Sequence, residues 1–288
     1  MSRNLQREVT DRILAQLRAG VVPWRQPWSG QASGAMPRNA ITARGYSGVN
    51  VLLLWATAQE RGYSSPKWLT YKQALEAGGN VRKGEKSTMV VFVSTVEREE
   101  KDGTLKRIPF LKAFNVFNVA QCEGLPEIIE PRRARPNPDM RDDTAETFIV
   151  STGAKIGHGE SRAYFRPLTD SINLPAFETF SGAGAYYATA FHELGHWTGA
   201  ETRLNRQFGK RFGDQAYSAE ELVAELTSAF LCAEFAFDVE GNDAAYIATW
   251  IKFLSDHEGA IVTAASHASK AVAFMRDLAI AEPVAEAA

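Results

Sequence analysis

The sequence lacks the features that would place the protein in a membrane or outside the cell. No run approaches the roughly 20 consecutive apolar residues needed to cross a bilayer. Segment 1–20 carries charges throughout instead of the apolar core of a signal peptide. The chain of 288 residues has only two cysteines, Cys122 and Cys232, which are too far apart in sequence to form a metal-binding pair. We therefore expect reduced thiols in a cytoplasmic protein with no membrane partner.

The sequence also lacks internal repeats and the composition of a disordered chain, since 45% of its residues are hydrophobic and 23% are charged. The net charge is only −2, but the basic and acidic residues are distributed unevenly along the chain. Residues 1–120 hold 18 Lys and Arg against 9 Asp and Glu, whereas the other 168 residues hold 14 against 25. Net charges of +9 and −11 predict two domains, and the basic one is suited to a polyanion.

Apolar periodicity and turn residues predict an α+β first domain over residues 1–121. Helices are expected over 4–19, 50–61 and 70–77. Two runs rich in Val and Phe, 88–96 and 108–119, flank the turn pair Asp102-Gly103. This pattern is typical of a β-hairpin, so a small unit built on an antiparallel hairpin is predicted.

The rest of the chain is predicted to be a linker followed by a mostly helical domain. Residues 122–145 contain four prolines and many charges, which is typical of a linker. The second domain, 146–288, begins with a short helix and two short strands, 163–165 and 172–174; the latter is a candidate edge strand for an extended peptide. Further helices are expected over 183–199, 218–237, 243–256 and 258–279.

The most specific pattern is His192-Glu193-Leu194-Gly195-His196. Residues four apart share one helix face, so both imidazoles can point at one ion, and Glu193 between them is the candidate general base. The alternative is a pair of histidines satisfied near a core. Because the glutamate accompanies the pair, we favour a metal site, with zinc as the expected ion and manganese as an alternative.

Zinc held by two histidines needs a third protein ligand. Glu221 and Glu225 lie one turn apart on a predicted helix, so we expect Glu221 to bind the metal and Glu225 to orient a ligand histidine. Glu220 or Glu225 as the ligand, a capping role for Glu221 with Ser218, and a plain acidic helix face are the alternatives.

Loops of the first domain alternate aromatic and basic residues. Single-stranded nucleic acid binding needs a positive groove for the backbone and aromatic faces for the bases, and the basic charge supplies sequence-independent affinity. Alternatively, the tryptophans pack in a core and the charges are solvated. The candidate DNA contacts are Trp24, Arg25, Trp28, Arg38, Asn39, Arg44, Tyr46, Lys67, Trp68, Arg82, Lys83 and Lys86.

Two sets of motifs resemble one known family. Trp24-Arg-Gln-Pro-Trp28, Thr42-x-Arg-Gly-Tyr-Ser-Gly-Val-Asn50 and Gly79-Asn-Val-Arg-Lys-Gly-Glu-Lys86 resemble the N-terminal domain of ArdC-type antirestriction proteins, which is shared with TraC-type plasmid primases. The segments 186–199 and 217–226 resemble the zincin-like metallopeptidase domain of the same proteins.

This resemblance covers nearly the whole chain and implies a single-stranded-DNA-binding domain fused to a gluzincin-like domain. It implies metal ligands at His192, His196 and an acid between 220 and 225, with Glu193 as general base. Such proteins are carried by conjugative plasmids and protect incoming DNA from restriction. The absence of primase and helicase signatures argues against a priming role.

Three functions follow from these features. The first is an antirestriction protein that binds entering single-stranded DNA and whose metallopeptidase-like domain acts on a protein, such as a host restriction enzyme. The second is a DNA-binding module with a structural, non-catalytic metal. The third is an intracellular zinc protease whose basic domain binds protein. An intact Glu193 gives the capacity for catalysis without deciding among the three.

Overall fold

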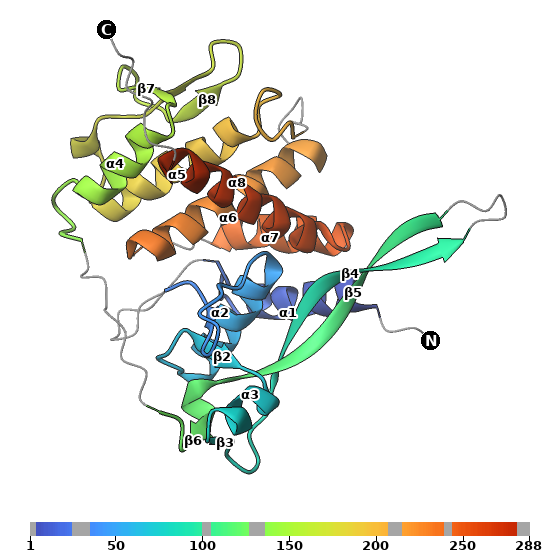
Figure 1. Ribbon diagram of the computed structural model, residues 1–288. Coiled ribbons are helices and arrows are strands. Elements are labelled where there is room, and N and C mark those ends of the chain that lie inside the picture. The colour runs from blue at the N-terminus through green and yellow to red at the C-terminus, as the bar shows by residue number, and fades with distance from the viewer. Residues whose placement is uncertain are drawn as a thin grey trace, which may run out of the picture. The chain divides into compact units, whose positions relative to one another are not determined.

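The computed structural model describes residues 4–24, 35–99, 105–126, 136–206, 215–238 and 244–280 (Figure 1). The chain divides into two compact units. Unit 1 comprises the described residues within Met1–Pro23, Met36–Glu130 and Ala244–Val262, and unit 2 those within Trp24–Ala35, Pro131–Asp243 and Thr263–Ala288. Two predicted DNA contacts, Arg25 and Trp28, lie outside these ranges.

The helices of unit 1 are α1 (Leu5–Arg18), α2 (Val49–Arg61), α3 (Tyr71–Glu76) and α7 (Ala244–Asp256). Asn4 caps α1 by accepting a hydrogen bond from the backbone N–H of Arg7. The apolar stripe of α1 is buried, and α1 contacts α7. The sequence had placed α7 in the second domain, because an amphipathic pattern does not identify the partner that covers it.

Unit 1 contains a four-stranded sheet in the order β1–β2–β5–β4. The strands are β1 (Arg38–Asn39), β2 (Lys67–Leu69), β4 (Thr88–Glu99) and β5 (Leu105–Asn118). β4 and β5 pair antiparallel along their length, which confirms the predicted hairpin strands; the turn pair between them lies outside the described residues. The side chain of Asn50 bonds both the backbone N–H and the carbonyl of Val91 at 2.7 Å, so α2 closes the free edge of β4 at this point.

The predicted linker 122–145 contains ordered elements at both ends. A short 3₁₀ helix (Val119–Gln121) leads into β6 (Cys122–Glu123), which pairs with β3 (Asn80–Val81) inside unit 1. At the other end, the Asp142 carboxylate accepts from Ala145 N–H and starts α4 (Asp143–Ser151). Proline content marked the segment as irregular, but strand pairing and a helix cap decide where each unit ends.

Unit 2 is mostly helical, as predicted, with α5 (Ala183–Thr198), α6 (Gln215–Phe235) and, from Thr263 onward, α8 (Ala260–Ile280) in addition to α4. Its small sheet has the order β7–β9–β8, formed by β7 (Lys155–Gly157), β8 (Tyr164–Arg166) and β9 (Ser171–Asn173), and a 3₁₀ turn follows at Phe177–Thr179. β9 is paired on both sides. The candidate edge strand near 172–174 is therefore a central strand, and β8 is an edge. Every helix within the described residues is too short or too polar to span a bilayer.

Candidate metal centre

Helices α5 and α6 pack closely at a glycine of the histidine motif. A Cβ added to Gly195 would lie 3.0 Å from Cα of Ala224 and 3.3 Å from Cβ of Thr227. Further along the pair, the Ser228 hydroxyl donates to the carbonyl of Ala188 at 2.7 Å. Because Gly195 carries no side chain, α6 can bring its acidic residues against the two histidines.

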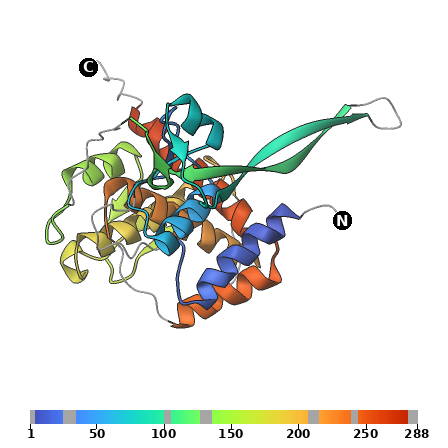
Figure 2. The ribbon, with the colours of Figure 1, turned by 90° about the horizontal axis from the view of Figure 1, so that it is seen from below.

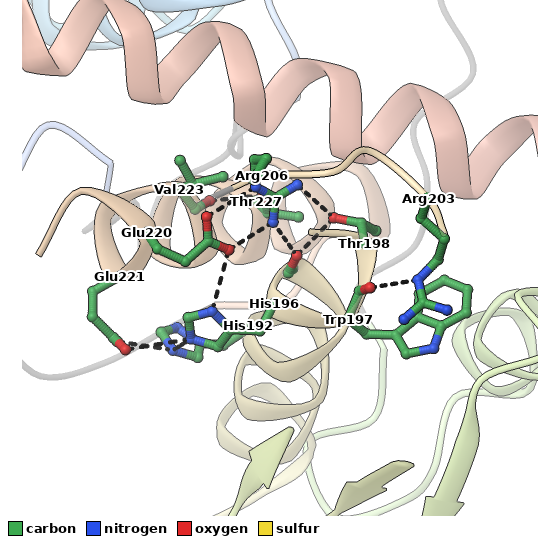
Figure 3. A network of polar contacts seen from close by, with 11 residues as sticks. His192, His196, Trp197, Thr198, Arg203, Arg206, Glu220, Glu221, Val223 and Thr227 are labelled. Atoms are coloured by element: carbon green, nitrogen blue, oxygen red, sulfur yellow. Dashed lines mark hydrogen bonds and ion pairs between the residues drawn. The ribbon is translucent and has the colours of Figure 1, made fainter. Parts of the chain in front are cut away.

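Three side chains of this helix pair direct ligand atoms toward one another (Figure 3). Nε2 of His192 and Nε2 of His196 are 3.2 Å apart, and the carboxylate of Glu221 lies 3.4 Å from the first and 3.5 Å from the second. The structure thus brings together the three residues that the sequence singled out as metal ligands.

The donor set and its spacing fit one divalent ion. Two imidazole nitrogens and a carboxylate oxygen form the His₂Glu set of catalytic zinc sites. Metal–ligand bonds of about 2.0–2.1 Å in tetrahedral geometry place two ligand atoms about 3.4 Å apart, which agrees with the three distances found here. The residues are therefore already spaced to hold a metal.

A second carboxylate supports His196 from its other ring nitrogen. Oε1 of Glu220 lies 3.4 Å from Nδ1 of His196. In the neutral ring that binds a metal, this contact favours the tautomer with the proton on Nδ1, which leaves Nε2 as the acceptor. The one-turn spacing from Glu221 had favoured Glu225 for this role. Glu220 takes it because neighbouring residues of a helix differ by about 100° in direction, so Glu221 reaches Nε2 while Glu220 reaches Nδ1.

Arg206 connects Glu220 to the end of α5 (Figure 3). Its guanidinium donates to both Glu220 oxygens at 2.9 and 2.7 Å, to Oγ1 of Thr198 at 2.9 Å and to the Gly195 carbonyl at 2.6 Å. Glu220 and Arg206 are 5% and 8% exposed, so the pair is a fully hydrogen-bonded buried ion pair. Sequence reasoning missed Arg206, because it follows α5 in a segment without a periodic pattern.

These contacts shift the protonation of the ligands. Burial disfavours the charged form of His196, but hydrogen bonds to Glu220 and Glu221 outweigh it and raise its pKa to about 9. Burial likewise opposes ionisation of Glu221, but hydrogen bonds from His192 and His196 lower its pKa. Burial and the Glu221 carboxylate raise the pKa of Tyr217 to about 12. Glu221 is therefore ionised and Tyr217 is neutral at pH 7.

A cavity of about 440 Å³ opens over the ligands, lined by Ala163, Tyr164, Phe165, Pro167, His192, Glu193, His196, Tyr217, Glu220 and Glu221. Glu193 is 7% exposed and accepts a hydrogen bond from the backbone N–H of Phe165, on edge strand β8. Burial raises its pKa more than the nearby histidines lower it. A carboxylate of raised pKa is the kind of group that takes up a proton during general base catalysis.

The structure separates the candidate DNA contacts into buried and accessible residues. Trp24 and Trp68 are 1% exposed and Lys67 is 6% exposed. The prediction that these three contact DNA is therefore wrong in this structure. Trp68 lies on β2 between two paired strands and meets Tyr63 edge-on, with ring centroids 6.0 Å apart. The ring of Trp68 is therefore a core side chain of unit 1 in this structure.

The remaining candidates are half-buried or exposed. Asn39 is bonded to Gln73 at 3.0 Å, and burial raises the pKa of its neighbour Tyr46. Arg38 is also half-buried. The exposed candidates are Arg44, Arg82, Lys83 and Lys86. Arg82 is partly engaged, since it donates to Glu85 at 2.8 Å and to the Ala120 carbonyl at 2.7 Å.

Two family models match successive parts of the chain. The N-terminal domain of the anti-restriction factor ArdC matches residues 3–117, and a zincin-like metallopeptidase matches residues 143–267. An uncharacterized protein, y4eC of Sinorhizobium fredii, is 39% identical over 93% of this chain and 90% of its own length. A DNA primase TraC of Escherichia coli is 38% identical over 91% of this chain, which spans 26% of that protein.

Two crystal structures of the antirestriction protein ArdC from plasmid R388 share the fold. The metal-free structure is 42% identical, covers 96% of this chain and 98% of its own, and has a TM-score of 0.82. The Mn(II)-bound structure is 40% identical, covers 97% and 100%, and has a TM-score of 0.81. Both domain models and these near full-length matches lead to one conclusion: the chain belongs to the ArdC antirestriction family, with an ArdC N-terminal domain followed by a zincin-like metallopeptidase domain.

Proposed function

We propose that this protein protects incoming plasmid DNA from host restriction, binding the DNA as a single strand through unit 1 and acting on a protein through the metal centre of unit 2. The observation that carries the proposal is the match to an antirestriction protein over 98% of that protein's length at 42% identity. The net charge of +9 over residues 1–120 supports a polyanionic ligand for the first part. Two free thiols, Cys122 and Cys232, suit a cytoplasmic site of action.

We infer that zinc is the resident metal, held by His192, His196 and Glu221. When bound, the ion supplies a Lewis acid that polarises a carbonyl group and makes water more acidic. The solved relative contains Mn(II), so manganese is the alternative. Metal analysis of protein purified without added metal distinguishes them: we expect about one zinc per chain, and stoichiometric manganese would overturn this assignment.

The residues around the cavity suit peptide hydrolysis. Glu193 is positioned to accept a proton from the attacking water and to pass it to the leaving amine. Edge strand β8 contributes Tyr164 and Phe165 to the cavity wall, where an extended peptide can pair with its backbone. Tyr217 lines the same cavity, is neutral at pH 7 and bonds Glu221 through its hydroxyl, so a rotation of that hydroxyl would direct its proton to a developing oxyanion.

The decisive test replaces Glu193 with glutamine. Glu193→Gln keeps the size of the side chain and removes the base, so metal content and DNA binding should persist. Conjugation into a restricting host, at equal protein levels, should then lose its protection. Glu258→Gln on the surface is a matched control for the loss of one carboxylate, and it should protect like wild type. Full protection by Glu193→Gln would show that the metal has a structural role.

A further inference from the structure

Unit 1 carries a row of exposed rings on one face of the β4–β5 ribbon. Residues directly opposite in an antiparallel ladder project from the same face. The relevant opposite pairs are Phe92–Lys112, Ser94–Phe110 and Val90–Phe114. Three phenylalanines and one lysine therefore share a face. We call Phe92, Phe110, Lys112 and Phe114 the aromatic face.

The rings of the aromatic face are in solvent rather than in a core. Phe92, Phe110 and Phe114 are 45%, 44% and 41% exposed. Phe92 and Phe114 meet edge-on with centroids 5.4 Å apart, and Nζ of Lys112 lies 5.3 Å from the centroid of Phe114. Contiguous exposed apolar side chains mark interaction sites, so a ligand with flat apolar surfaces and negative charge would suit this group.

The aromatic face continues a buried face outward. Nearer the helices, the same side of the ribbon is buried at Thr88, Val90 and Val116. The ribbon then extends beyond α1 and α2 (Figure 2). A solvated sheet face is ordinarily polar where no element covers it. The exposed part of this face has polar side chains at Ser94 and Lys112 but keeps three phenylalanines beside them, which indicates that the rings have a partner.

We propose that the aromatic face is the base-stacking platform of unit 1 for single-stranded DNA, an inference that rests on the proposed function. Side chains two apart on a strand are about 7 Å apart, so Phe110 and Phe114 flank Lys112 in an aromatic–cation–aromatic row. The rings offer stacking surfaces to bases, and Lys112 offers a charge to the phosphates. The basic charge of residues 1–120 favours a nucleic acid over a protein as the occupant.

The first test separates stacking from apolar contact. In the full-length protein, Phe92→Leu, Phe110→Leu and Phe114→Leu together keep apolar side chains and remove the rings. Anisotropy of a fluorescent oligo-dT should report an affinity at least about 5-fold weaker, because stacking on one ring accounts for about 5- to 150-fold. The corresponding triple Tyr variant should restore binding. Val93→Ala is the matched control, since Val93 is 71% exposed on the opposite face of β4.

The second test removes the bases instead of the rings. An abasic oligonucleotide of the same length should bind wild type and the triple Leu variant equally. Lys112→Ala should reduce the slope of log affinity against log salt by about 1 on both oligonucleotides, whereas the Leu variant should keep the wild-type slope.

The outcomes distinguish the two proposals. If wild type fails to bind oligo-dT, the proposed function of unit 1 fails. If wild type binds and the folded triple Leu variant, checked by circular dichroism, binds equally well, the aromatic face is not the platform. Equal losses on abasic and complete oligonucleotides would also overturn it. A change in the oligomeric state of the Leu variant, measured by light scattering, would overturn it too. Such a change would mean that the aromatic face joins copies of the chain.

Discussion

The metal centre of unit 2 and the aromatic face of unit 1 are built in opposite ways. At the metal centre, the ligands are half-buried and rest on a buried polar pair in which Arg206 holds Glu220. On the ribbon, apolar rings are exposed and contact one another and Lys112. A buried polar network fixes geometry, so a change in one member affects the rest. Exposed rings have few neighbours, and we expect changes there to stay local.

Removal of a metal ligand should have the largest effect on the metal centre and almost none on DNA binding by unit 1. His192→Ala or Glu221→Ala leaves two of three protein ligands, so metal content after dialysis should fall below detection. Binding of single-stranded DNA should stay within about 2-fold of wild type, because no ligand belongs to unit 1. Metal analysis and anisotropy on the same preparation check both expectations. A loss of DNA affinity when the metal is removed would show that the two sites are not independent.

Removing the buried partner of Glu220 should have the next largest effect. Arg206→Met leaves the buried Glu220 carboxylate without its guanidinium partner, and breaking such buried pairs costs about 3–5 kcal/mol of unfolding free energy. Urea denaturation measures this loss. The double variant Arg206→Met with Glu220→Leu removes both charges, so it should be more stable than Arg206→Met alone. If the single variant is as stable as wild type, the network does not hold the site.

A smaller effect is expected from the carboxylate that supports His196. Glu220→Gln keeps the shape but loses the charge at Nδ1, and loss of such a support costs about 10–100-fold in metal affinity. Glu225→Gln, on the same helix, is the matched control and should change affinity by less than about 3-fold. Competition with a fluorescent zinc chelator gives both values. The reverse ranking would restore Glu225 to the role that the sequence suggested.

The smallest predicted effect concerns acid stability. The guanidinium of Arg203 bonds both oxygens of Asp170, at 3.1 and 2.5 Å, and lowers the pKa of that carboxyl. A lowered pKa in the folded state gives stability that is present above the unfolded value near 3.9 and is lost as pH falls through the folded value. Because Asp170 is half-exposed, the contribution is below about 1 kcal/mol. Asp170→Asn should flatten the acid limb of stability against pH, measured by urea denaturation from pH 5 to 2, and should match wild type in slope at pH 7.

The sequence predicted those parts of the molecule that follow from local pattern. Helix α5 and strands β4 and β5 have clear periods, and the spacing of His192 and His196 needs only one helix. Strands such as β1 and β3 have two residues each, too few to show a period. Which helix covers α1, and which carboxylate faces Nδ1 of His196, depend on packing between distant segments, so pattern alone did not identify them.

The aromatic residues show that sequence pattern also fails to predict which rings are buried and which are exposed. The basic neighbours of Trp68 favour a DNA contact, yet its ring is 1% exposed and packs against Tyr63. Phe110, Lys112 and Phe114 alternate in sequence, which places them on one face of any strand. The alternation therefore predicts a shared face. It does not predict that this face extends past the helices that cover the rest of the ribbon.

The bond pair between Asn50 and Val91 has a consequence for how molecules of this protein meet. β4 is the edge strand of its sheet, and an exposed edge beside aromatic rings invites pairing with the same strand of another molecule. The amide of Asn50 occupies both outward backbone groups of Val91 and so mimics one residue of a neighbouring strand. An incoming strand cannot align past this position without first expelling the amide. The same side chain that anchors α2 to the sheet therefore also obstructs the growth of intermolecular β-structure along the base of the ribbon.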